Sequence, residues 1–545
     1  MSEVVRLELK RVAEALGVGD LGFSLERPRD HGHGDFATNL ALVIAKTRQT
    51  NPRRVAEEVI AALQLPSTVV SKVEIAGPGF INFWLAADNL TSALTAIITA
   101  GSRYGRSTIG VGRPVNVEFV SANPTGPLHV GHGRGAALGD GIAALLEWNG
   151  YSVVREFYIN DAGSQIDKLA LSLWARVQQA VGRPGEIPEG GYHGDYLIEA
   201  AAELLAQEGT GFPDLPVAAA LPQCRDFALK SQRIEQDGLL KDFGVTFQAH
   251  TSEQSLYDSG KVEAALALVA AKGLSYESEG AIWLKTTQFG DDKDRVLKKS
   301  DGSYTYLVPD IAYHVDKFAR GFETLIDVWG ADHHGYISRI RAVLAALGFD
   351  GGAFEVPLIQ LVKVVKAGEE VKMSKRAGNF VTLRDLLDEV GTDACRYFFL
   401  MRRGDTPFTF DVDLAKKQTD ENPVFYVQMA HARMSGIFRV AGQEPEQVGD
   451  HADMAGLPLP QDGELLKALT LFPEVVARAG AEREPHRVTG YLDELARIAH
   501  GWYHHCRVLG EAPEVERSRL VLARAARIVL ANGLSLLGLT APDRM

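Results

Sequence analysis

The chain of 545 residues is too long for a single hydrophobic core, and the usual domain size of roughly 100–200 residues suggests three or four units. A net charge of −13 argues against a generally basic coat for nucleic acid, although it leaves room for local basic patches. The three cysteines are widely spaced and form no CxxC pair, which suits a reducing compartment and excludes a cysteine-based zinc knuckle.

Residues 1–105 are predicted to form an α/β module. Apolar spacing predicts three helices and then two strands, at residues 5–16, 39–45, 55–63, 69–75 and 80–85. The polar turn after the first helix holds His31 and His33, which we interpret as turn residues, while a catalytic role stays open. Residues 101–112 are expected to be a linker.

The next segment places two histidines between a predicted strand at 115–119 and a predicted helix at 138–146. His129 and His132 therefore stand near a helix start, where unpaired N–H groups and the close approach allowed by Gly131 suit a phosphate. Their imidazoles could donate to oxygens that gain charge during phosphoryl or nucleotidyl transfer. The pair could instead bind a metal, or simply be surface histidines.

A second strand is predicted at residues 153–159, ending in Asn160 and Asp161. Strand, helix and strand in this order imply a right-handed parallel crossover. Ligands of such sheets bind outside the carboxyl ends of the strands, where the histidine pair and Asn160 both lie. Residues 166–285 are expected to be an insertion that serves mainly as scaffold.

The second half of the sheet is predicted between residues 295 and 410. Apolar runs predict strands at residues 304–308, 325–329 and 359–365. Helices are expected after the first two strands, and Thr382 and Thr392 mark the starts of two more.

Lys372 and Lys375 follow the last of these strands, in the sequence Lys-Met-Ser-Lys-Arg. Two lysines can hold a cluster of phosphates and stabilise a leaving pyrophosphate. Alone, the segment could be an exposed lysine turn. Together with the histidine pair at the end of an earlier strand of the same sheet, it indicates a triphosphate site.

Residues 411–545 are predicted to form a helical bundle. Its clearest helices are expected at residues 424–438, 465–479, 488–507 and 520–537. Arginines recur along the last two helices, and these could form a solvated helix face. Beside exposed aromatic side chains such as Trp502 and Tyr503, they would suit nucleic acid better.

These motifs resemble those of class I aminoacyl-tRNA synthetases. Residues 129–132 match the HIGH motif and residues 372–376 the KMSKS motif, with Arg376 in place of the final serine. Longer stretches resemble arginyl-tRNA synthetases, at residues 33–39, 117–128, 329–336, 422–428 and 540–545. The resemblance therefore runs through nearly the whole chain.

The resemblance implies a multidomain α/β protein with three parts. A Rossmann-like catalytic domain with a parallel sheet would span residues 113–410 and carry the insertion at about 166–285. The N-terminal α/β module, residues 1–105, is expected to bind the tRNA elbow, and the helical domain, residues 411–545, the anticodon loop.

The reaction implied by the resemblance joins L-arginine to tRNA(Arg). The arginine carboxylate attacks the α-phosphate of ATP, and pyrophosphate leaves. The 2′-hydroxyl of the terminal adenosine of the tRNA then takes the arginyl group, and AMP is released. In this family activation normally also requires bound tRNA. Mg²⁺ is expected with ATP, held mainly by phosphates and water, and neither a protein metal site nor zinc is expected.

Site residues are carried over from the family motifs. Catalysis is assigned to His129, His132, Lys372 and Lys375. Contacts with ATP are assigned to His129, Gly131, His132, Asp332, Met373, Ser374 and Lys375. Contacts with arginine are assigned to Glu118, Asn123, Tyr306, Asp310 and His333. Asp310 is expected to accept the guanidinium fork and Glu118 the ammonium, although the opposite division stays open.

Two other functions stay open. A different nucleotidyltransferase with this histidine motif would act on a small phosphate ester without tRNA, and a tRNA-binding paralogue without catalysis would not need both histidines and both lysines. No signal pattern and no run of about 18 apolar residues is found, so we expect a cytoplasmic protein without a membrane span. A monomer is the family expectation.

Overall fold

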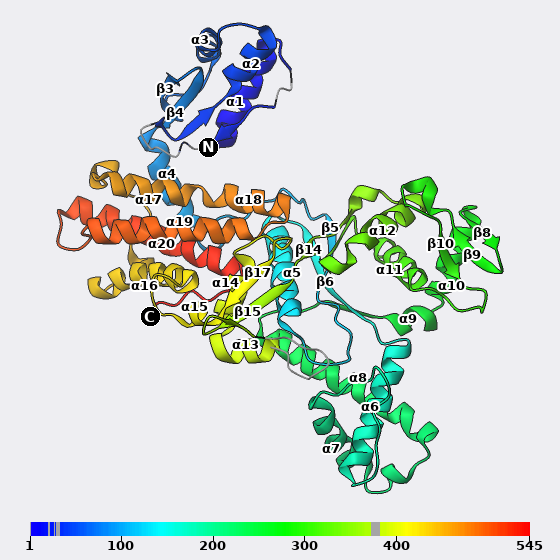
Figure 1. The fold of residues 1–545 in the computed structure, drawn as a ribbon. Coiled ribbons are helices and arrows are strands. Elements are labelled where there is room, and N and C mark those ends of the chain that lie inside the picture. The colour runs from blue at the N-terminus through cyan, green and yellow to red at the C-terminus, as the bar shows by residue number, and fades with distance from the viewer. Residues whose placement is uncertain (1, 20–21, 27, 29–32, 372–381) are drawn as a thin grey trace.

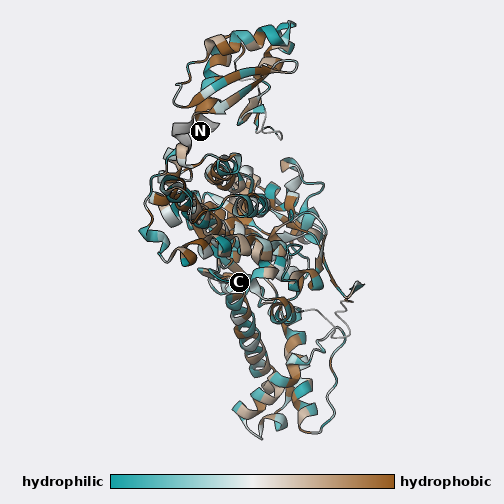
Figure 2. Ribbon diagram, turned by 90° about the vertical axis from the view of Figure 1, so that its left-hand side faces the viewer, coloured by the Kyte–Doolittle hydropathy of each residue, from teal (hydrophilic) through white to brown (hydrophobic). Residues whose placement is uncertain are grey.

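The computed structural model describes residues 2–19, 22–26, 28, 33–371 and 382–545. Figure 1 shows an N-terminal module, a helical bundle, a central parallel sheet with its covering helices, and an arm of helices that projects from the centre. Seen from the side in Figure 2, the module and the arm stand at opposite ends of an elongated molecule. In the described ranges, no helix combines the length and apolar character needed to cross a membrane.

The N-terminal module combines three helices with a four-stranded antiparallel sheet of order β1-β2-β4-β3. Its elements are α1 (Ser2–Ala15), β1 (Leu25–Glu26), β2 (Phe36–Thr38), α2 (Leu40–Arg48), α3 (Pro52–Ala62), β3 (Val70–Ala76) and β4 (Phe80–Leu85). The three predicted helices and the two predicted strands are confirmed. Helix α4 (Ala87–Ala100) has no counterpart among the predicted elements and leads from this sheet to the bundle.

Five parallel strands form the central sheet, in the order β13-β11-β5-β6-β7. They are β5 (Pro114–Glu118), β6 (Ser152–Ile159), β7 (Ala249–Ser252), β11 (Thr324–Asp327) and β13 (Phe354–Glu355). Helix α5 (Val130–Trp148) joins β5 to β6, which confirms the predicted parallel crossover. Glu118 is the register partner of both Asp327 and Glu156, so three carboxylates lie side by side on adjacent strands.

The range expected to be an insertion contains two different structures. Helices α6 (Ser164–Ala180), α7 (Tyr196–Glu208) and α8 (Val217–Asp242) form the projecting arm, around an apolar core of their own that includes Leu173 and Leu204. The chain then returns to the central sheet, where β7 pairs with β6 as an edge strand. Its sequence, Ala-His-Thr-Ser, has no apolar run, so the pattern that predicted the other strands is missing here.

Helices and a small antiparallel sheet follow β7. They are α9 (Glu253–Asp258), α10 (Lys261–Ala271), β8 (Ser275–Ser278), β9 (Ala281–Leu284), β10 (Arg295–Lys298), α11 (Leu307–Ala319) and α12 (His334–Ala346). The strand predicted at 304–308 is wrong, because Tyr304 makes only an isolated bridge with Lys298 and α11 begins at Leu307. Pro309 is tolerated in the first turn of α11, where its missing N–H would have had no helical partner.

The strand predicted at 359–365 is divided between two small sheets. β14 (Leu358–Ile359) pairs with β12 (Trp329–Gly330), whereas β15 (Val362–Lys366) lies between β16 (Glu369–Glu370) and β17 (Phe408–Asp411). Three helices follow in this part of the chain: α13 (Leu383–Val390), α14 (Thr392–Leu400) and α15 (Val412–Lys416). The predicted helix starts at Thr382 and Thr392 are confirmed, and Thr382 and Asp385 cap α13 reciprocally.

The C-terminal part is the predicted bundle. Its helices are α16 (Pro423–Ala441), α17 (Pro460–Thr470), α18 (Phe472–Glu482), α19 (His486–His505) and α20 (Pro513–Leu536). The single helix predicted at 465–479 is two helices, because Pro473 stands in the first turn of α18. Trp502 is buried rather than exposed, and it donates to Asp462 together with the buried Arg519. Some of these arginines therefore hold the bundle together.

A buried arginine joins the bundle to helix α5, which covers the central sheet. Arg396 of α14 donates to the carbonyl oxygen of Leu537, at the end of α20, over 3.0 Å, and to that of Phe243, after α8, over 3.1 Å. It also contacts the carboxylate of Asp140 in α5 at 2.6 Å. Because Arg396 is fully buried, three distant segments of the chain are fixed around one guanidinium.

Candidate active site

The two histidines of the motif are stacked at the start of α5, with ring centroids 3.6 Å apart. His129 is the N-cap, and its Nδ1 accepts the backbone N–H groups of Gly131 at 3.1 Å and of His132 at 3.3 Å. The Nδ1 of His132 accepts the N–H of His129 in return, at 3.3 Å. Because both Nδ1 atoms are acceptors, each neutral ring carries its proton on Nε2.

Gly131 is required by this histidine cap. A Cβ added to residue 131 would lie 2.9 Å from Cε1 of His129, closer than real side chains approach. The N–H groups that were expected to face a phosphate are instead taken up, at residues 131 and 132, by the ring of His129. The arrangement fixes the direction of both imidazoles.

The residues that follow the lysine segment lie directly against the histidine motif. Thr382 forms an antiparallel bridge with His129, and the N–H of Leu383 donates to the carbonyl of Leu128 at 2.8 Å. On the other side of the segment, the N–H of Val371 donates to the carbonyl of Val364 in β15 at 2.9 Å. The predicted site residues Lys372, Met373, Ser374 and Lys375 lie outside the described residues.

Glu118 ends β5 and is almost completely buried. Its Oε1 accepts a hydrogen bond from Ser121 Oγ at 2.9 Å, and its Oε2 accepts one from the ammonium of Lys317. Asn123 lies on the loop that follows β5, and its amide donates to Gln165 Oε1 at 3.0 Å. The two residues predicted for the arginine ammonium are therefore at the end of a strand and on the loop after it, each with a protein partner.

Asp310 and Tyr306 lie at the start of α11. The carboxylate of Asp310 accepts a hydrogen bond from Tyr336 Oη of α12 at 2.5 Å, and burial raises the pKa of this carboxyl group. Tyr306 is 74% exposed, so its ring has no packed position against Asp310 in this structure. The first turn of α11 thus presents one held carboxylate and one exposed phenol ring.

Glu253 is a candidate residue that sequence reasoning missed. It starts α9 directly after β7, and it accepts a hydrogen bond from the buried Tyr158 Oη at 3.2 Å. Burial raises the pKa of Glu253 to about 7, and the nearby charges of Asp310 and Asp161 add to this effect. A signal did exist, since a carboxylate at the carboxyl end of a parallel strand is typical of a ligand site, but β7 itself was not recognised.

Asp332 and His333 lie on the exposed turn between β12 and α12. The carboxylate of Asp332 is 3.5 Å from Nε2 of His333, and both side chains are more than half exposed. The ring of His333 lies edge-on to Trp329, with centroids 6.2 Å apart. Both predicted residues are therefore at the surface, where a ligand can reach them.

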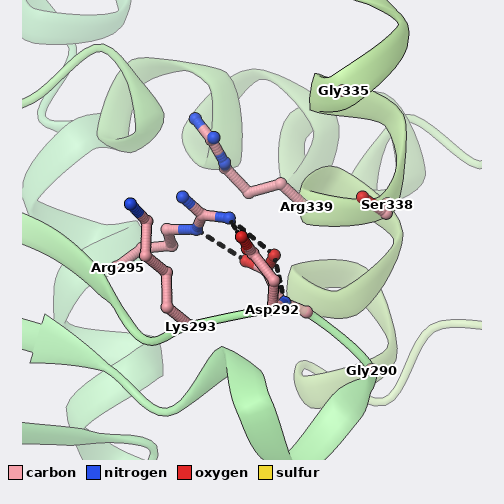
Figure 3. Close-up of a pocket in the computed structure, with 8 residues that line it drawn as sticks. Gly290, Asp292, Lys293, Arg295, Gly335, Ser338 and Arg339 are labelled. Atoms are coloured by element: carbon pink, nitrogen blue, oxygen red, sulfur yellow. Dashed lines mark hydrogen bonds and ion pairs between the residues drawn. The ribbon is translucent and has the colours of Figure 1, made fainter.

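A separate cavity of about 510 Å³ lies beside α12 (Figure 3). Its lining residues are Gly290, Asp291, Asp292, Lys293, Arg295, Gly335, Ser338 and Arg339. Arg295 is paired with Asp291 at 2.7 Å, and the guanidinium of Arg339 lies 4.8 Å from the centre of the Tyr336 ring. The cavity contains none of the predicted site residues, but Tyr336 connects it to Asp310.

Comparison with solved structures defines the class of the fold. The methionyl-tRNA synthetase of Mycobacterium tuberculosis, in complex with methionyl-adenylate, aligns with a TM-score of 0.52 and 14% identity over 79% of this chain and 92% of that one. The arginyl-tRNA synthetase of Thermus thermophilus aligns with a TM-score of 0.79 and 23% identity over 100% of both chains. The fold is that of a class I aminoacyl-tRNA synthetase.

Sequence comparison then gives the family. Three family profiles match: the arginyl-tRNA synthetase N-terminal domain at 3–85, the class I (R) catalytic domain at 93–191 and 222–404, and the DALR anticodon-binding domain at 427–545. Arginine–tRNA ligases of Bacillus licheniformis and Syntrophotalea carbinolica are 47% and 50% identical, covering 100% and 96% of this chain and 99% and 95% of their own. The chain belongs to the arginyl-tRNA synthetases.

Proposed function

We propose that this chain is an arginine–tRNA ligase that forms arginyl-adenylate from L-arginine and ATP and then transfers arginine to the terminal adenosine of tRNA(Arg). In the first step an oxygen of the arginine carboxylate bonds to the α-phosphorus, and the bond to pyrophosphate breaks. In the second step the 2′-hydroxyl of the adenosine attacks the activated carbonyl, and AMP leaves with the bonding electrons. The observation that carries this proposal is the bridge between Thr382 and His129, which places the first described residue after the lysine segment beside the histidine motif.

The nucleotide roles follow from that contact. His129 and His132 donate from Nε2 to the α-phosphate oxygens as these gain charge, since both Nδ1 atoms are used by the backbone. Lys372 and Lys375 bind the β- and γ-phosphates, with Met373 and Ser374 also contacting ATP. Asp332 binds the ribose. Mg²⁺ enters with ATP, held by phosphates and water rather than by a protein cage.

The arginine roles rest on the carboxylates of the sheet edge and α11. Asp310, fixed by Tyr336, accepts the guanidinium fork, and Glu253 is an additional acceptor for it. Tyr306 closes over the guanidinium, and His333 borders the site. Glu118 and Asn123 bind the ammonium group of arginine. Their side-chain oxygens can accept further hydrogen bonds besides those that they make within the protein.

The tRNA contacts are divided between two parts of the chain. The N-terminal module, residues 1–105, binds the tRNA elbow, and the bundle of residues 411–545 binds the anticodon loop. Exposed Tyr503, with the guanidinium of Arg433 5.8 Å from its ring centre, is suited to stacking on an RNA base. A catalytic domain at 113–410, a monomeric state and a cytoplasmic location complete the proposal.

The test is ATP–pyrophosphate exchange with each amino acid in turn, with and without tRNA. Exchange with arginine alone among the amino acids, and only when tRNA is present, supports the proposal. Exchange with a different amino acid would reject the specificity, and exchange that ignores tRNA would favour a nucleotidyltransferase acting on a small molecule.

A further inference from the structure

A lysine is buried between two carboxylates beneath the site. The side chain of Lys317, in α11, is fully buried, and its ammonium donates to Glu118 of β5 and to Oδ1 of Asp327 of β11, the latter at 2.8 Å. The ring of Tyr313 lies 4.3 Å from the same nitrogen. Nothing in the proposed reaction uses Lys317, yet it holds one of the carboxylates assigned to arginine.

His314 lies on the same face of α11 as Lys317, between two hydrogen-bond acceptors. Nδ1 of His314 is 2.7 Å from the carbonyl oxygen of Asp310, and Nε2 is 3.0 Å from Oδ2 of Asp327. A carbonyl and a carboxylate oxygen can only accept hydrogen bonds, so both ring nitrogens must donate. His314 is therefore a buried imidazolium, and the raised pKa of its ring, caused mainly by Asp327 against the effect of burial, agrees with this geometry.

The other titratable groups of the cluster respond in different directions. Burial raises the pKa of Glu118, although the ammonium of Lys317 acts against this effect. Burial alone would raise the pKa of Asp327, but the two cations hold it below its usual value. The next carboxylate along, Glu156, is paired separately with Arg320 at 2.8 Å.

The contacts form one continuous chain. Tyr336 holds the carboxylate of Asp310, and His314 ties the backbone of the same residue to Asp327. Lys317 then joins Asp327 to Glu118. Residues 310, 314 and 317 share one face of α11, because they are four and three positions apart. The two carboxylates at the ends of this chain are those assigned to opposite ends of arginine.

We propose that His314 and Lys317 are positioning residues that set the separation between Asp310 and Glu118, and so match the site to the length of arginine. The inference rests on the proposed function, because it assumes that both carboxylates face the substrate. Neither residue touches the substrate. They act by fixing two substrate-binding groups that come from different elements, a helix start and a strand end.

The first experiment compares His314→Gln with the native chain in tRNA-dependent ATP–pyrophosphate exchange. The amide of glutamine cannot span both acceptors, so we expect the KM for arginine to rise about tenfold while the KM for ATP stays unchanged. Homoarginine is longer than arginine by one methylene. The ratio of kcat/KM for homoarginine to kcat/KM for arginine should therefore be about tenfold higher in His314→Gln than in the native chain. His193→Gln, an exposed histidine between α6 and α7, is the matched control and should behave as the native chain.

The outcomes are distinct. Unchanged KM for arginine and unchanged discrimination against homoarginine in His314→Gln would overturn the inference, as would equal rises in both KM values. If the native chain shows no exchange with arginine, the proposed function fails instead.

A second measurement does not depend on activity or on the folding of a core variant. Nitrogen-15 histidine spectra of the native chain should contain one ring that loses its second proton at a higher pH than the exposed histidines do, because both of its nitrogens lie against acceptors. In Asp327→Asn, whose amide can donate to Nε2 while its oxygen still accepts from Lys317, this ring should become neutral at a lower pH. A native spectrum in which no histidine ring titrates above the exposed ones would overturn the assignment of His314. Two further variants, Lys317→Met and Lys317→Met/Asp327→Asn, test the positioning role of Lys317. The double variant removes one buried charge of each sign, so it should fold, while it should bind arginine only weakly.

Discussion

Thr382 pairs with His129 in an isolated antiparallel bridge, so the first described residue after the lysine segment is a neighbour of the first histidine of the motif. The same Thr382 is the N-cap of α13, where its Oγ1 accepts the N–H of Asp385 at 3.0 Å. One residue therefore connects the end of the lysine segment, the start of a helix and the histidine site. The following predictions use this and the other contacts of the site.

Lys375→Ala should lower tRNA-dependent exchange by roughly 100- to 1,000-fold, because one positive charge at the developing pyrophosphate is lost. Circular dichroism and the thermal unfolding midpoint should stay at their native values. Lys299→Ala, an exposed lysine before α11, is the control and should keep native activity. Near-native exchange in Lys375→Ala would refute the role of this residue.

Thr382→Ala should lower the free energy of unfolding by about 1 kcal/mol, because the N-cap acceptor of α13 is lost. The KM for ATP should rise as well, since the return of the chain to His129 loosens. Asn51→Ala removes the equivalent cap of α3 in the N-terminal module. This control should show the same loss of stability with no change in the KM for ATP. An equal KM for ATP in Thr382→Ala and Asn51→Ala would count against a role of Thr382 in ATP binding.

Arginine binding should release protons at neutral pH. The pKa of Glu253 is about 7 in the free protein, so this carboxyl group is about half protonated at pH 7. A guanidinium beside it lowers the pKa and drives the proton off. Calorimetry in two buffers of different ionisation enthalpy should give about half a proton released per arginine at pH 7. In Glu253→Gln the release should vanish; if it persists, another group is its source.

His314 should make part of the stability depend on pH in a defined direction. Its pKa in the folded chain is raised above the unfolded value of about 6.5, so its contribution is complete below that pH and is lost as the pH rises through the folded pKa. In Asp327→Asn the ring can be neutral without losing its contacts. The difference in unfolding free energy between the native chain and this variant should therefore shrink as pH increases above 6.5. A difference that grows with pH would contradict the imidazolium.

The bundle has its own buried ion pair to break. Asp462 accepts from Arg519 at 3.1 Å on each oxygen and from Trp502 Nε1 at 2.8 Å, and all three side chains are buried. Asp462→Ala leaves the guanidinium without its partner and should cost about 3–5 kcal/mol in urea unfolding. Asp453→Ala, a cap of a short turn in the same region, should cost far less. Similar losses of unfolding free energy in Asp462→Ala and Asp453→Ala would show that the ion pair of Asp462 and Arg519 is solvated.

The sequence predicted the parallel crossover and the histidine motif well, because both depend on local periodicity. It failed at 304–308, where β-branched and aromatic residues enter a helix start, although Pro309 and Asp310 are typical of a first helical turn. It also placed Trp502 at the surface, since helical spacing alone does not say that Asp462 offers an internal acceptor. Such partners come from distant parts of the chain.

The same limit explains what was missed in the site. Glu253 depends on β7, a four-residue edge strand with a polar sequence that is recognisable only from its pairing with β6. Helical spacing alone does not distinguish Lys317 and His314 from other residues of α11. Their importance arises from β5 and β11, which bring Glu118 and Asp327 together across the sheet.

The arginine that joins Asp140, Phe243 and Leu537 has a consequence for biosynthesis. While the ribosome has yet to deliver residue 537, the guanidinium of Arg396, which is fully buried in the folded chain, lacks one of its acceptors. The nascent catalytic domain therefore cannot complete its packing early in translation. Chains that terminate before this point should be recognised by proteases as unfinished, even though every motif for catalysis has already been synthesised.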